Sequence, residues 1–333
     1  MEENDYAFPD LGEFRLIQSL LKDRFPLSNP SPKHRFWVDA GDDAAGVDGW
    51  LITKDLSMEN THFLLDYSTM AQAVEKHIVS NVSDISSMGG VPMIAFLGLG
   101  LNRHWNEDQR NALIDAFQKG FKSRGIRLLG GDTVVGDVGF FSTTLLGQTT
   151  LVQPLKRSSA KPGERVYVQG TLGKSAAGLW VLLNHPEDKE KWRSLVNYHL
   201  NPVIKEHAGE ALAEMNAISA CIDISDGLSS ELNHIACSSG VKLTIEKENL
   251  PVDPDVLTMC EYYGLSTDLF VLNGGEEYQL LFTSSFSNSI FYSNNDRIGT
   301  VCDIGLVQVG SGVELVDSQG VKVQMNAQSW SHL

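Results

Sequence analysis

Acidic residues recur along the whole chain where apolar segments end, often beside glycine. They are Asp42, Asp43, Asp55, Asp132, Asp223, Asp226 and Glu276, with Asp84 inside a helical segment. Carboxylates gathered in one fold repel one another by roughly 4 kcal/mol per pair at about 4 Å and an effective dielectric of about 20. A fold that brings these residues together therefore needs cations. Taken singly, each residue is better explained as a helix cap or a solvated turn.

This acidic pattern would suit ATP chemistry. Hard divalent ions such as Mg²⁺ prefer oxygen ligands and commonly bridge one or two carboxylates to substrate phosphates. Glycine pairs at 130–131 and 274–275 would let backbone N–H groups approach a phosphate, although each could equally form an ordinary turn. The segment 170–175 lacks two intervening residues of a P-loop, and no G-x-G-x-x-G occurs. A P-loop or Rossmann enzyme is therefore disfavoured.

Length and charge exclude several broad classes of protein. At roughly 150 residues per domain, 333 residues suggest two domains. Hydrophobic residues make up 42% and charged residues 20%, which is typical of a packed globular protein. The formal net charge of −16 repels nucleic acid and anionic membrane surfaces. Binding to a polyanion is therefore disfavoured as the main function, and no nucleic-acid partner is expected.

Nothing in the sequence predicts a membrane or secretory segment. The longest apolar run, 91–101, contains a proline and is well short of the roughly 20 residues needed to span a bilayer. The N-terminus is acidic and lacks the basic start of a secretory signal, so the cytoplasm is the expected location. The four cysteines are widely spaced without a C-x-x-C pair, which predicts neither a disulfide framework nor a zinc site.

Hydrophobic spacing predicts alternating helices and strands. Helices are expected at 11–21, 69–89, 106–125, 174–184 and 201–215, and in a segment that ends at Gly240. Strands are expected at 36–38, 50–53, 94–101, 128–129 leading into 130–133, 140–152, 221–222, 241–245 and 278–283. The turn at Lys161-Pro162-Gly163 precedes a restart of the pattern, so we divide the chain into 1–152 and 153–333.

Five motifs, taken in order, resemble those of thiamine-monophosphate kinase. They are GDDAA at 41–45, NVSDISSMGGVP at 81–92, GGDT at 130–133, IDISDGL at 222–228 and GGEEY at 274–278. The resemblance runs from Gly12-Glu13-Phe14 to Trp330, so it covers nearly the full length. Each motif alone is weak, but their order and separations are specific for the wider superfamily that includes aminoimidazole ribonucleotide synthetase. The last motif favours the kinase branch.

The resemblance implies a fold and an activity. The implied fold is α/β of the α+β type, with two domains as in aminoimidazole ribonucleotide synthetase. Residues 1–152 would form an N-terminal sheet that binds ATP and Mg²⁺ and pairs into the barrel of a homodimer. Residues 153–333 would form an α/β domain that completes the nucleotide and thiamine site. The implied reaction is direct transfer of the γ-phosphoryl group of ATP to thiamine monophosphate, with several Mg²⁺ ions.

The family motifs also imply roles for individual residues. The implied metal ligands are Asp43, Thr53, Lys54, Asp55, Asp84, Asp132, Asp223 and Asp226, of which Asp43, Asp132, Asp223 and Asp226 would form the reaction centre. Gly131, Asp132, Arg157 and Ser225 would contact the nucleotide, and His62, Glu276 and Trp330 the thiamine substrate. On sequence alone, Arg157 could equally be a solvated surface residue and Trp330 a packed tail residue.

Three departures from the family pattern leave details open. Lys54 stands where a small hydroxyl residue is usual, and strand alternation would turn its side chain away and leave only its carbonyl at the metal side. Alternatively, its ammonium would replace one metal ion. The turn reads GGEEYQ rather than GGEDYE, and Leu200-Asn201-Pro202 lacks the arginine usual before that proline.

Other functions are weighed against this one. A selenophosphate synthetase should carry a reactive cysteine near its N-terminus, whereas the first cysteine here is Cys221, and the hydrogenase-maturation relative needs a C-terminal cysteine. Both are disfavoured. Aminoimidazole ribonucleotide synthetase stays open, and so does a nucleotide-binding regulator that has lost turnover.

Overall fold

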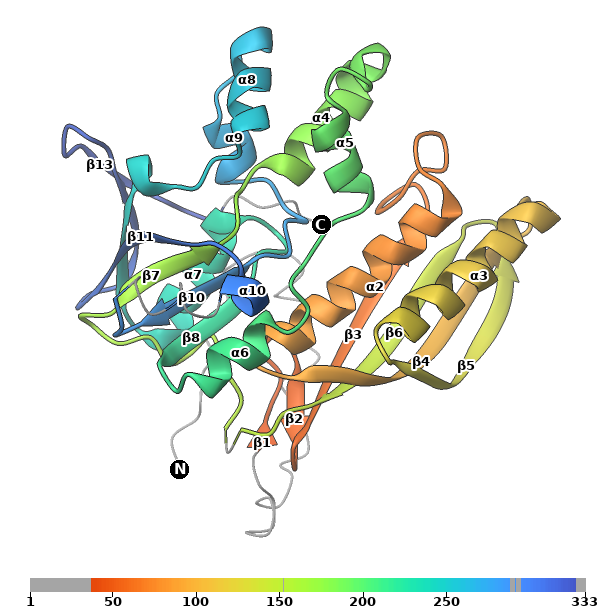
Figure 1. Cartoon of the computed structure of the whole chain (residues 1–333), viewed down its shortest axis with the longest axis horizontal. Coiled ribbons are helices and arrows are strands. Elements are labelled where there is room, and N and C mark those ends of the chain that lie inside the picture. The colour runs from red at the N-terminus through yellow and green to blue at the C-terminus, as the bar shows by residue number, and fades with distance from the viewer. Residues whose placement is uncertain (1–36, 152, 288–290, 292–294, 328–333) are drawn as a thin grey trace.

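A computed structural model describes residues 37–151, 153–287, 291 and 295–327. The described residues form a six-stranded and a seven-stranded sheet. Figure 1 shows the two sheets side by side, with helices covering them and a further group of helices at one end of the molecule. The helix expected at 11–21 and the substrate residue Trp330 lie outside the described residues.

The first sheet has the strand order β1-β2-β3-β6-β4-β5. Its neighbours are antiparallel except β4 and β5, which are parallel and joined through helix α3. Its elements are β1 Trp37–Val38, β2 Ala45–Val47, β3 Trp50–Met58, α2 Met70–Ser87, β4 Val91–Asn102, α3 Glu107–Ser123, β5 Arg127–Gly136 and β6 Phe140–Gln148. Helices α2 and α3 lie across one face of this sheet (Figure 1).

Helix α2 begins and ends where the sequence predicts. The side chain of Thr69 caps its first turn in a capping box with Gln72, which satisfies N–H groups that have no partner within the helix. Gly89, with a φ of +74°, follows its end. The apolar side chains of Val74, Ile78 and Ile85 are fully buried in the core of the first sheet. This packing fixes which side of α2 faces the remainder of the molecule.

The second sheet has the order β13-β12-β9-β11-β7-β10-β8 and is antiparallel except for the pair β12 and β9. Its strands are β7 Arg165–Gln169, β8 Ile218–Asp223, β9 Lys242–Glu246, β10 Leu280–Ser284, β11 Val301–Gln308, β12 Gly312–Val316 and β13 Lys322–Gln324. The helices of this half are α4 Lys174–Asn184, η1 Pro186–Asp188, α5 Arg193–Leu200, α6 Ala208–Glu214, α7 Leu228–Ser239, η2 Lys247–Asn249, α8 Pro254–Tyr263, α9 Asp268–Val271 and α10 Asn295–Ile298.

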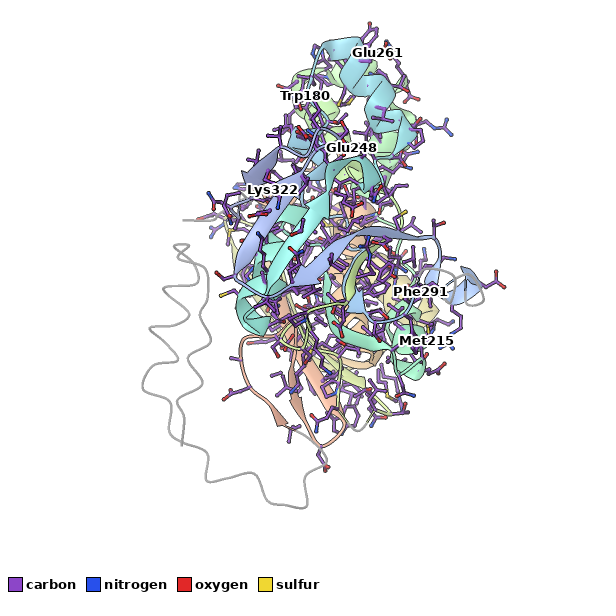
Figure 2. All side chains as sticks on the ribbon, turned by 90° about the vertical axis from the view of Figure 1, so that its left-hand side faces the viewer. Trp180, Met215, Glu248, Glu261, Phe291 and Lys322 are labelled. Carbon is purple, nitrogen blue, oxygen red and sulfur yellow. The ribbon has the colours of Figure 1, made fainter. Side chains whose placement is uncertain are left out.

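Helices α4, α5, α8 and α9 form a helical layer with an apolar core of its own. Figure 2 shows Trp180 of α4 and Glu261 of α8 at the end of the molecule remote from Met215 and Phe291. The second sheet is packed by two other apolar clusters. The two-sheet α/β organisation expected from the resemblance is confirmed.

The prediction of a helix at 201–215 is wrong about where the helix begins. Asn201 ends α5, and α6 begins only at Ala208. Pro202 explains the difference, because the ring of a proline disfavours a helical conformation in the residue before it. A proline can begin a helix, but here it follows one that it terminates.

The first sheet ends at Gln148 and the second begins at Arg165, so the proposed division at 152 falls in the connecting segment. Within the described ranges, no helix is both long and apolar enough to cross a bilayer.

Candidate active site

Four of the predicted acidic residues meet where α2 contacts β8, at the seam between the two sheets. Asp43 lies between β1 and β2, Asp55 on β3, Asp84 on α2, and Asp223 at the end of β8. The side chain of Asp43 is only 3% exposed, and Asp223 is 2% exposed. Residues 180 positions apart in the chain thus share one buried region.

Mutual repulsion among these carboxylates is visible in their pKa values. Burial, followed by Asp55, Asp223 and Asp43, raises the pKa of Asp84 well above its ordinary value. Burial and then Asp43 raise the pKa of Asp223 to about 8. Such shifts arise when charged groups leave water and approach like charges. The described residues therefore gather more negative charge than they neutralise.

Hydroxyl groups hold the carboxylates in place. Thr53 of β3 donates to Asp84 at 2.5 Å. From α2, Ser83 donates to Asp223 and Ser87 to Asp43, both at 2.5 Å. The bond from Ser83 joins the helix of the first sheet to a strand of the second. The geometry of the acidic cluster therefore depends on how the two halves of the chain pack together.

Arg157 lies within the cluster rather than on the surface. Its guanidinium forms an ion pair with Asp43, its Nε lies 3.6 Å from Asp42, and its backbone N–H donates to Asp42. Burial alone would lower the pKa of Arg157, but Asp43 and Asp42 raise it. Burial and Asp43 also raise the pKa of Asp42 to about 6. The structure thus excludes the interpretation of Arg157 as a solvated residue.

The chemistry of this donor set fits Mg²⁺. The groups joined by these hydrogen bonds are carboxylate and hydroxyl oxygens, the ligands that hard divalent cations prefer. A divalent cation would also relieve the repulsion that raises the pKa values of Asp84 and Asp223. Asp43, Asp55, Asp84 and Asp223 would hold it. Among the described residues, no three of these carboxylates place their oxygens within 4.8 Å of one another, so the side chains would have to move closer around an ion.

The ammonium of Lys54 points away from these carboxylates. Lys54 is exposed, whereas its neighbours Thr53 and Asp55 face inward. Its Nζ donates to Ser142 at 2.8 Å on the other face of the sheet. Strand alternation predicts this orientation. The alternative that the ammonium replaces a metal ion is wrong for this structure.

The loop after β8 brings further oxygens close to the cluster. The backbone N–H of Asp226 donates to Glu231 on the first turn of α7 at 3.1 Å. Burial, followed by Asp226 and Asp223, raises the pKa of Glu231 well above its ordinary value. Asp226 therefore stands near Asp223, as the motif leads one to expect.

The turn at 274–278 is fastened to this same loop. Glu276 donates its backbone N–H to the Ser225 carbonyl at 2.7 Å, and Tyr278 donates to Ile224 at 2.8 Å. A Cβ on Gly275 would lie 2.5 Å from the Ser225 oxygen, so only glycine allows this approach. Burial, then Glu276, Asp55, Asp223 and Asp84, raise the pKa of Tyr278. Tyr278 therefore lies near both Glu276 and the acidic cluster.

Helix α2 carries functional candidates that the motifs do not single out. Lys76 forms an ion pair with Glu276. Burial raises the pKa of Asp55, and a hydrogen bond from Ser80 opposes this effect. Polar residues at 76, 80, 83, 84 and 87 recur every three or four positions, which places them on one face of the helix. This polar face of the helix, next to its apolar face, was the sequence signal that could have identified Lys76 and Ser80.

Two residues predicted to contact the nucleotide lie far from the acidic cluster of the same chain. Gly131 and Asp132 lie inside β5, an exposed edge strand, and not in the turn that the glycine pair suggested. In the register of the sheet, Asp55 aligns with Gly131 through two intervening strands. At about 4.8 Å per strand, the separation is about 14 Å.

The predicted substrate residue His62 lies in the loop after β3. Its Nδ1 accepts from the backbone N–H of Met58 at 3.1 Å. The pKa of Glu276 is lowered below its ordinary value by Lys76, then His199, then His62, against the opposing and larger effect of burial. His62 is therefore on the side of the site where Glu276 lies.

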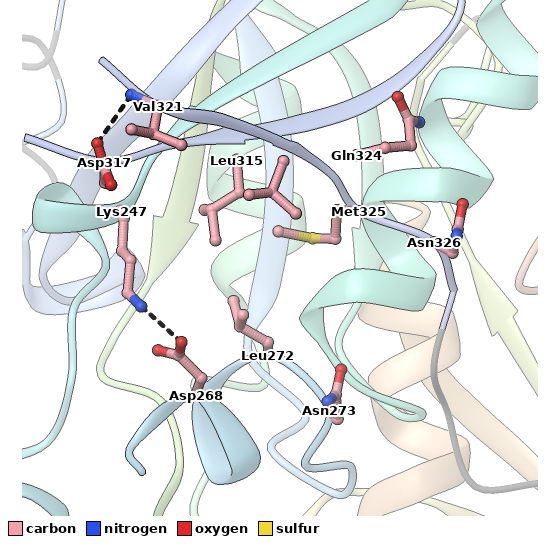
Figure 3. Close-up of a pocket in the computed structure, with 11 residues that line it drawn as sticks. Lys247, Asp268, Leu272, Asn273, Leu315, Asp317, Val321, Gln324, Met325 and Asn326 are labelled. Atoms are coloured by element: carbon pink, nitrogen blue, oxygen red, sulfur yellow. Dashed lines mark hydrogen bonds and ion pairs between the residues drawn. The ribbon is translucent and has the colours of Figure 1, made fainter. Parts of the chain in front are cut away.

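A cavity of about 300 Å³ adjoins the turn that carries Glu276. Figure 3 shows it between α9 and the β12–β13 hairpin, with an ion pair between Lys247 and Asp268 at its edge. Leu315 and Met325 supply part of its apolar lining, and Asn273, which precedes the glycine pair, also lines it. None of the clustered aspartates reaches this cavity.

The first sheet matches a known domain. Residues 41–149 match the family described as AIR synthase related protein, N-terminal domain. Most of the first sheet thus belongs to a domain of the AIR synthase related type.

Curated relatives narrow this class. The thiamine-monophosphate kinase of Aquifex aeolicus is 34% identical over 336 residues, which cover 97% of this chain and 98% of the relative. That of Leptospira interrogans is 32% identical, covering 83% of this chain and 84% of the relative. The chain belongs to the thiamine-monophosphate kinase family, whose members are phosphotransferases.

Solved structures agree with this assignment. A structure described as AaThiL complexed with AMPPCP and TMP has a TM-score of 0.81 and 30% identity, covering 97% of this chain and 96% of that chain. The hydrogenase maturation protein HypE has a TM-score of 0.66 at 20% identity, covering 90% of this chain and 97% of that one. At that identity the likeness extends to the fold alone.

Proposed function

We propose that this protein phosphorylates thiamine monophosphate to thiamine diphosphate, with ATP as the donor. The observation that carries the proposal is the convergence of Asp43, Asp55, Asp84 and Asp223 at the seam between the sheets. The relatives named thiamine-monophosphate kinase, and the neighbour solved with AMPPCP and TMP, supply the substrate class.

The reaction joins two anionic groups, so alignment and charge neutralisation are what the protein must provide. Mg²⁺ ions, held by Asp43, Asp55, Asp84, Asp223 and Asp226 with the Thr53 hydroxyl and the Lys54 carbonyl, would neutralise phosphate charge during an in-line transfer. The hydroxyls of α2 keep the carboxylates oriented before substrate arrives. No covalent intermediate on a side chain is needed.

The remaining predicted residues are assigned to the two substrates. Arg157 would offer its guanidinium to nucleotide phosphates, because its planar fork matches their oxygens. Ser225, in the loop after β8, would also contact the nucleotide. His62, Glu276 and Trp330 would contact the thiamine moiety, with the carboxylate accepting from the aminopyrimidine and the indole stacking on a flat ring.

We also propose that the protein acts as a homodimer built through the first sheet. The edge strand β5 exposes Leu128, Leu129, Val134 and Val135, each at least 50% accessible. An apolar edge of this kind favours pairing with another strand. Because Gly131 and Asp132 lie on β5, their contribution to the nucleotide site would depend on this pairing.

The expected cellular location is the cytoplasm. All four cysteines are free, which suits a reducing compartment.

A coupled assay tests the proposed reaction. Purified protein is supplied with ATP, Mg²⁺ and thiamine monophosphate, and thiamine diphosphate is quantified; in parallel, the substrate of aminoimidazole ribonucleotide synthetase is supplied instead. We expect ATP-dependent product only from thiamine monophosphate. No conversion at any Mg²⁺ concentration would contradict the proposal. ATP binding without any product would favour a regulator.

A further inference from the structure

Lys76 is a buried ammonium that bridges the two halves of the chain. It lies on α2 and is only 9% exposed. Its Nζ contacts both oxygens of Glu276, at 2.9 Å and 2.8 Å, and lies 3.3 Å from Nε2 of His199 on α5. The two oxygens of one carboxylate lie in nearly the same direction from Nζ, so the ammonium makes one bidentate contact with Glu276 and a separate contact with His199. Both oxygens of the carboxylate are thereby held in a fixed position.

His199 completes this arrangement as a neutral group. Burial, followed by Lys76, lowers the pKa of His199 to about 3. A neutral imidazole that accepts from Lys76 at Nε2 carries its proton on Nδ1, and Nδ1 lies 3.1 Å from the Ser175 hydroxyl. His199 therefore fixes the direction of the Lys76 ammonium.

The backbone holds Glu276 from the other side. Its φ of +61° lies in the left-handed region, which is uncommon for residues other than glycine. The bond from its N–H to Ser225 stabilises this conformation. The carboxylate of Glu276 is thus positioned at both its backbone and its oxygens, beyond what a solvated turn requires.

We propose that Lys76 is a positioning residue that makes Glu276 an acceptor-only group and so selects substrates that present a hydrogen-bond donor. This inference rests on the proposed function, in which that donor is the exocyclic amine of the aminopyrimidine. An ionised carboxylate accepts hydrogen bonds but cannot donate them. An analogue with an oxo group in place of the amine would set acceptor against acceptor and leave both unpaired, which costs binding.

The charges around Glu276 agree with this role. Burial alone would raise the pKa of Glu276, yet its neighbours, with the Lys76 ammonium as the largest contributor among them, keep it below the ordinary value. Burial and then Glu276 raise the pKa values of Tyr67 and Tyr278. Without the Lys76 ammonium, burial dominates, and a protonated carboxyl could donate to an oxo group.

The test compares two substrates in matched variants. For wild type, Lys76→Met and Lys76→Arg, kcat/KM is measured with thiamine monophosphate and with its oxo-pyrimidine analogue at saturating ATP. We expect the preference for the amine to fall about tenfold or more in Lys76→Met, mainly through KM, and to be largely restored in Lys76→Arg. The control is Lys242→Met, which removes an ammonium from the Lys242–Glu314 ion pair of the second sheet. Its preference should equal that of wild type.

A second variant keeps the proposal testable if Lys76→Met fails to fold. Glu276→Gln keeps the shape of the side chain but presents an amide that both accepts and donates, so the preference should fall there too. Adding Lys76→Met to it should change the preference no further. An unchanged preference in folded Lys76→Met or in Glu276→Gln would overturn the role of Lys76 while leaving the kinase function standing. If wild type fails to phosphorylate thiamine monophosphate, both proposals fall.

Discussion

At the scale of single residues, charge compensation shapes the site. Arg157 pairs with Asp42 and Asp43, so part of the acidic charge is balanced by the protein itself. The pKa values of Asp84 and Asp223 remain raised, first by burial and then by neighbouring carboxylates. The unbalanced charge is the structural reason to expect metal dependence.

Replacing Asp43 with asparagine tests its place in the reaction centre. Asparagine keeps an oxygen that can accept from Ser87 but removes the negative charge. We expect kcat to fall by roughly a hundredfold or more, with a near-unchanged melting temperature, because lost repulsion offsets the lost Arg157 ion pair. Steady-state kinetics and thermal unfolding measure both effects. Unchanged turnover would remove Asp43 from the metal site.

Glu277 provides a test of stability against pH. Its carboxylate accepts from the N–H groups of Gly173 and Ser175, yet burial raises its pKa to about 8. Between its ordinary pKa of 4.5 and about 8, the folded state holds a proton that the unfolded state has lost. The free energy of unfolding therefore falls as pH rises, by up to about 1.4 kcal/mol per pH unit from this group.

Glu277→Gln should remove that contribution, since an amide does not ionise. Denaturant unfolding without metal at several pH values from 5 to 8 should show the variant gaining stability relative to wild type as pH rises. Exposed Glu190→Gln serves as the control and should show the same pH dependence as wild type. A constant difference between Glu277→Gln and wild type across this range would show that Glu277 is ionised throughout.

At the scale of elements, α2 and the turn at 274–278 organise the site. One face of α2 packs into the first core, and its polar face holds the carboxylates and Glu276. The turn approaches the loop after β8 so closely that Gly275 has no room for a side chain. A change in either element should therefore affect the binding of both ATP and thiamine monophosphate.

Gly275→Ala tests the close approach of the turn. Its Cβ would meet the backbone oxygen of Ser225 at 2.5 Å, so the turn or the loop must shift. We expect a loss of roughly 1–3 kcal/mol in stability and a higher KM for thiamine monophosphate. Gly98→Ala is the control, because its nearest atom, on Ser142, lies at an ordinary 3.5 Å. Equal effects in the two variants would contradict this explanation.

At the scale of the whole molecule, the candidate active site is formed by both sheets. The edge strand β5 of the first sheet is apolar and exposed. The hydrogen bond between Ser83 and Asp223 crosses the seam, so neither half holds the complete acidic cluster. The exposed strand β5 carries Asp132 away from it. A second copy paired along β5 would cover the apolar edge.

Val135→Glu tests this assembly. Val135 is 64% exposed on β5, and a charge there should oppose strand pairing. Analytical ultracentrifugation should give about twice the 36.6 kDa chain mass for wild type and a single chain mass for the variant. Val309→Glu, at an 85% exposed valine in the second half, should remain dimeric. A monomeric wild type would refute the proposed dimer.

Local elements and the set of available chemical groups could be predicted from the sequence. The bounds of α2 followed from its capping residues and apolar spacing, and the side chain of Lys54 follows the alternation of β3. Both are short-range effects, set by backbone geometry within a few residues. The break at Pro202 is also local, but the same residue can begin or end a helix, so the prediction there was wrong.

Which groups come into contact depends on the packing of distant segments and could not be predicted from the sequence. Lys76 and Glu276 are 200 positions apart, and no local rule pairs them. Arg157 became a buried partner of Asp43, whereas Asp132, from an equally distinctive motif, stayed on an exposed strand. Contacts of this kind depend on how two separately patterned halves bury their apolar faces against each other, and that is a property of the whole chain rather than of any segment.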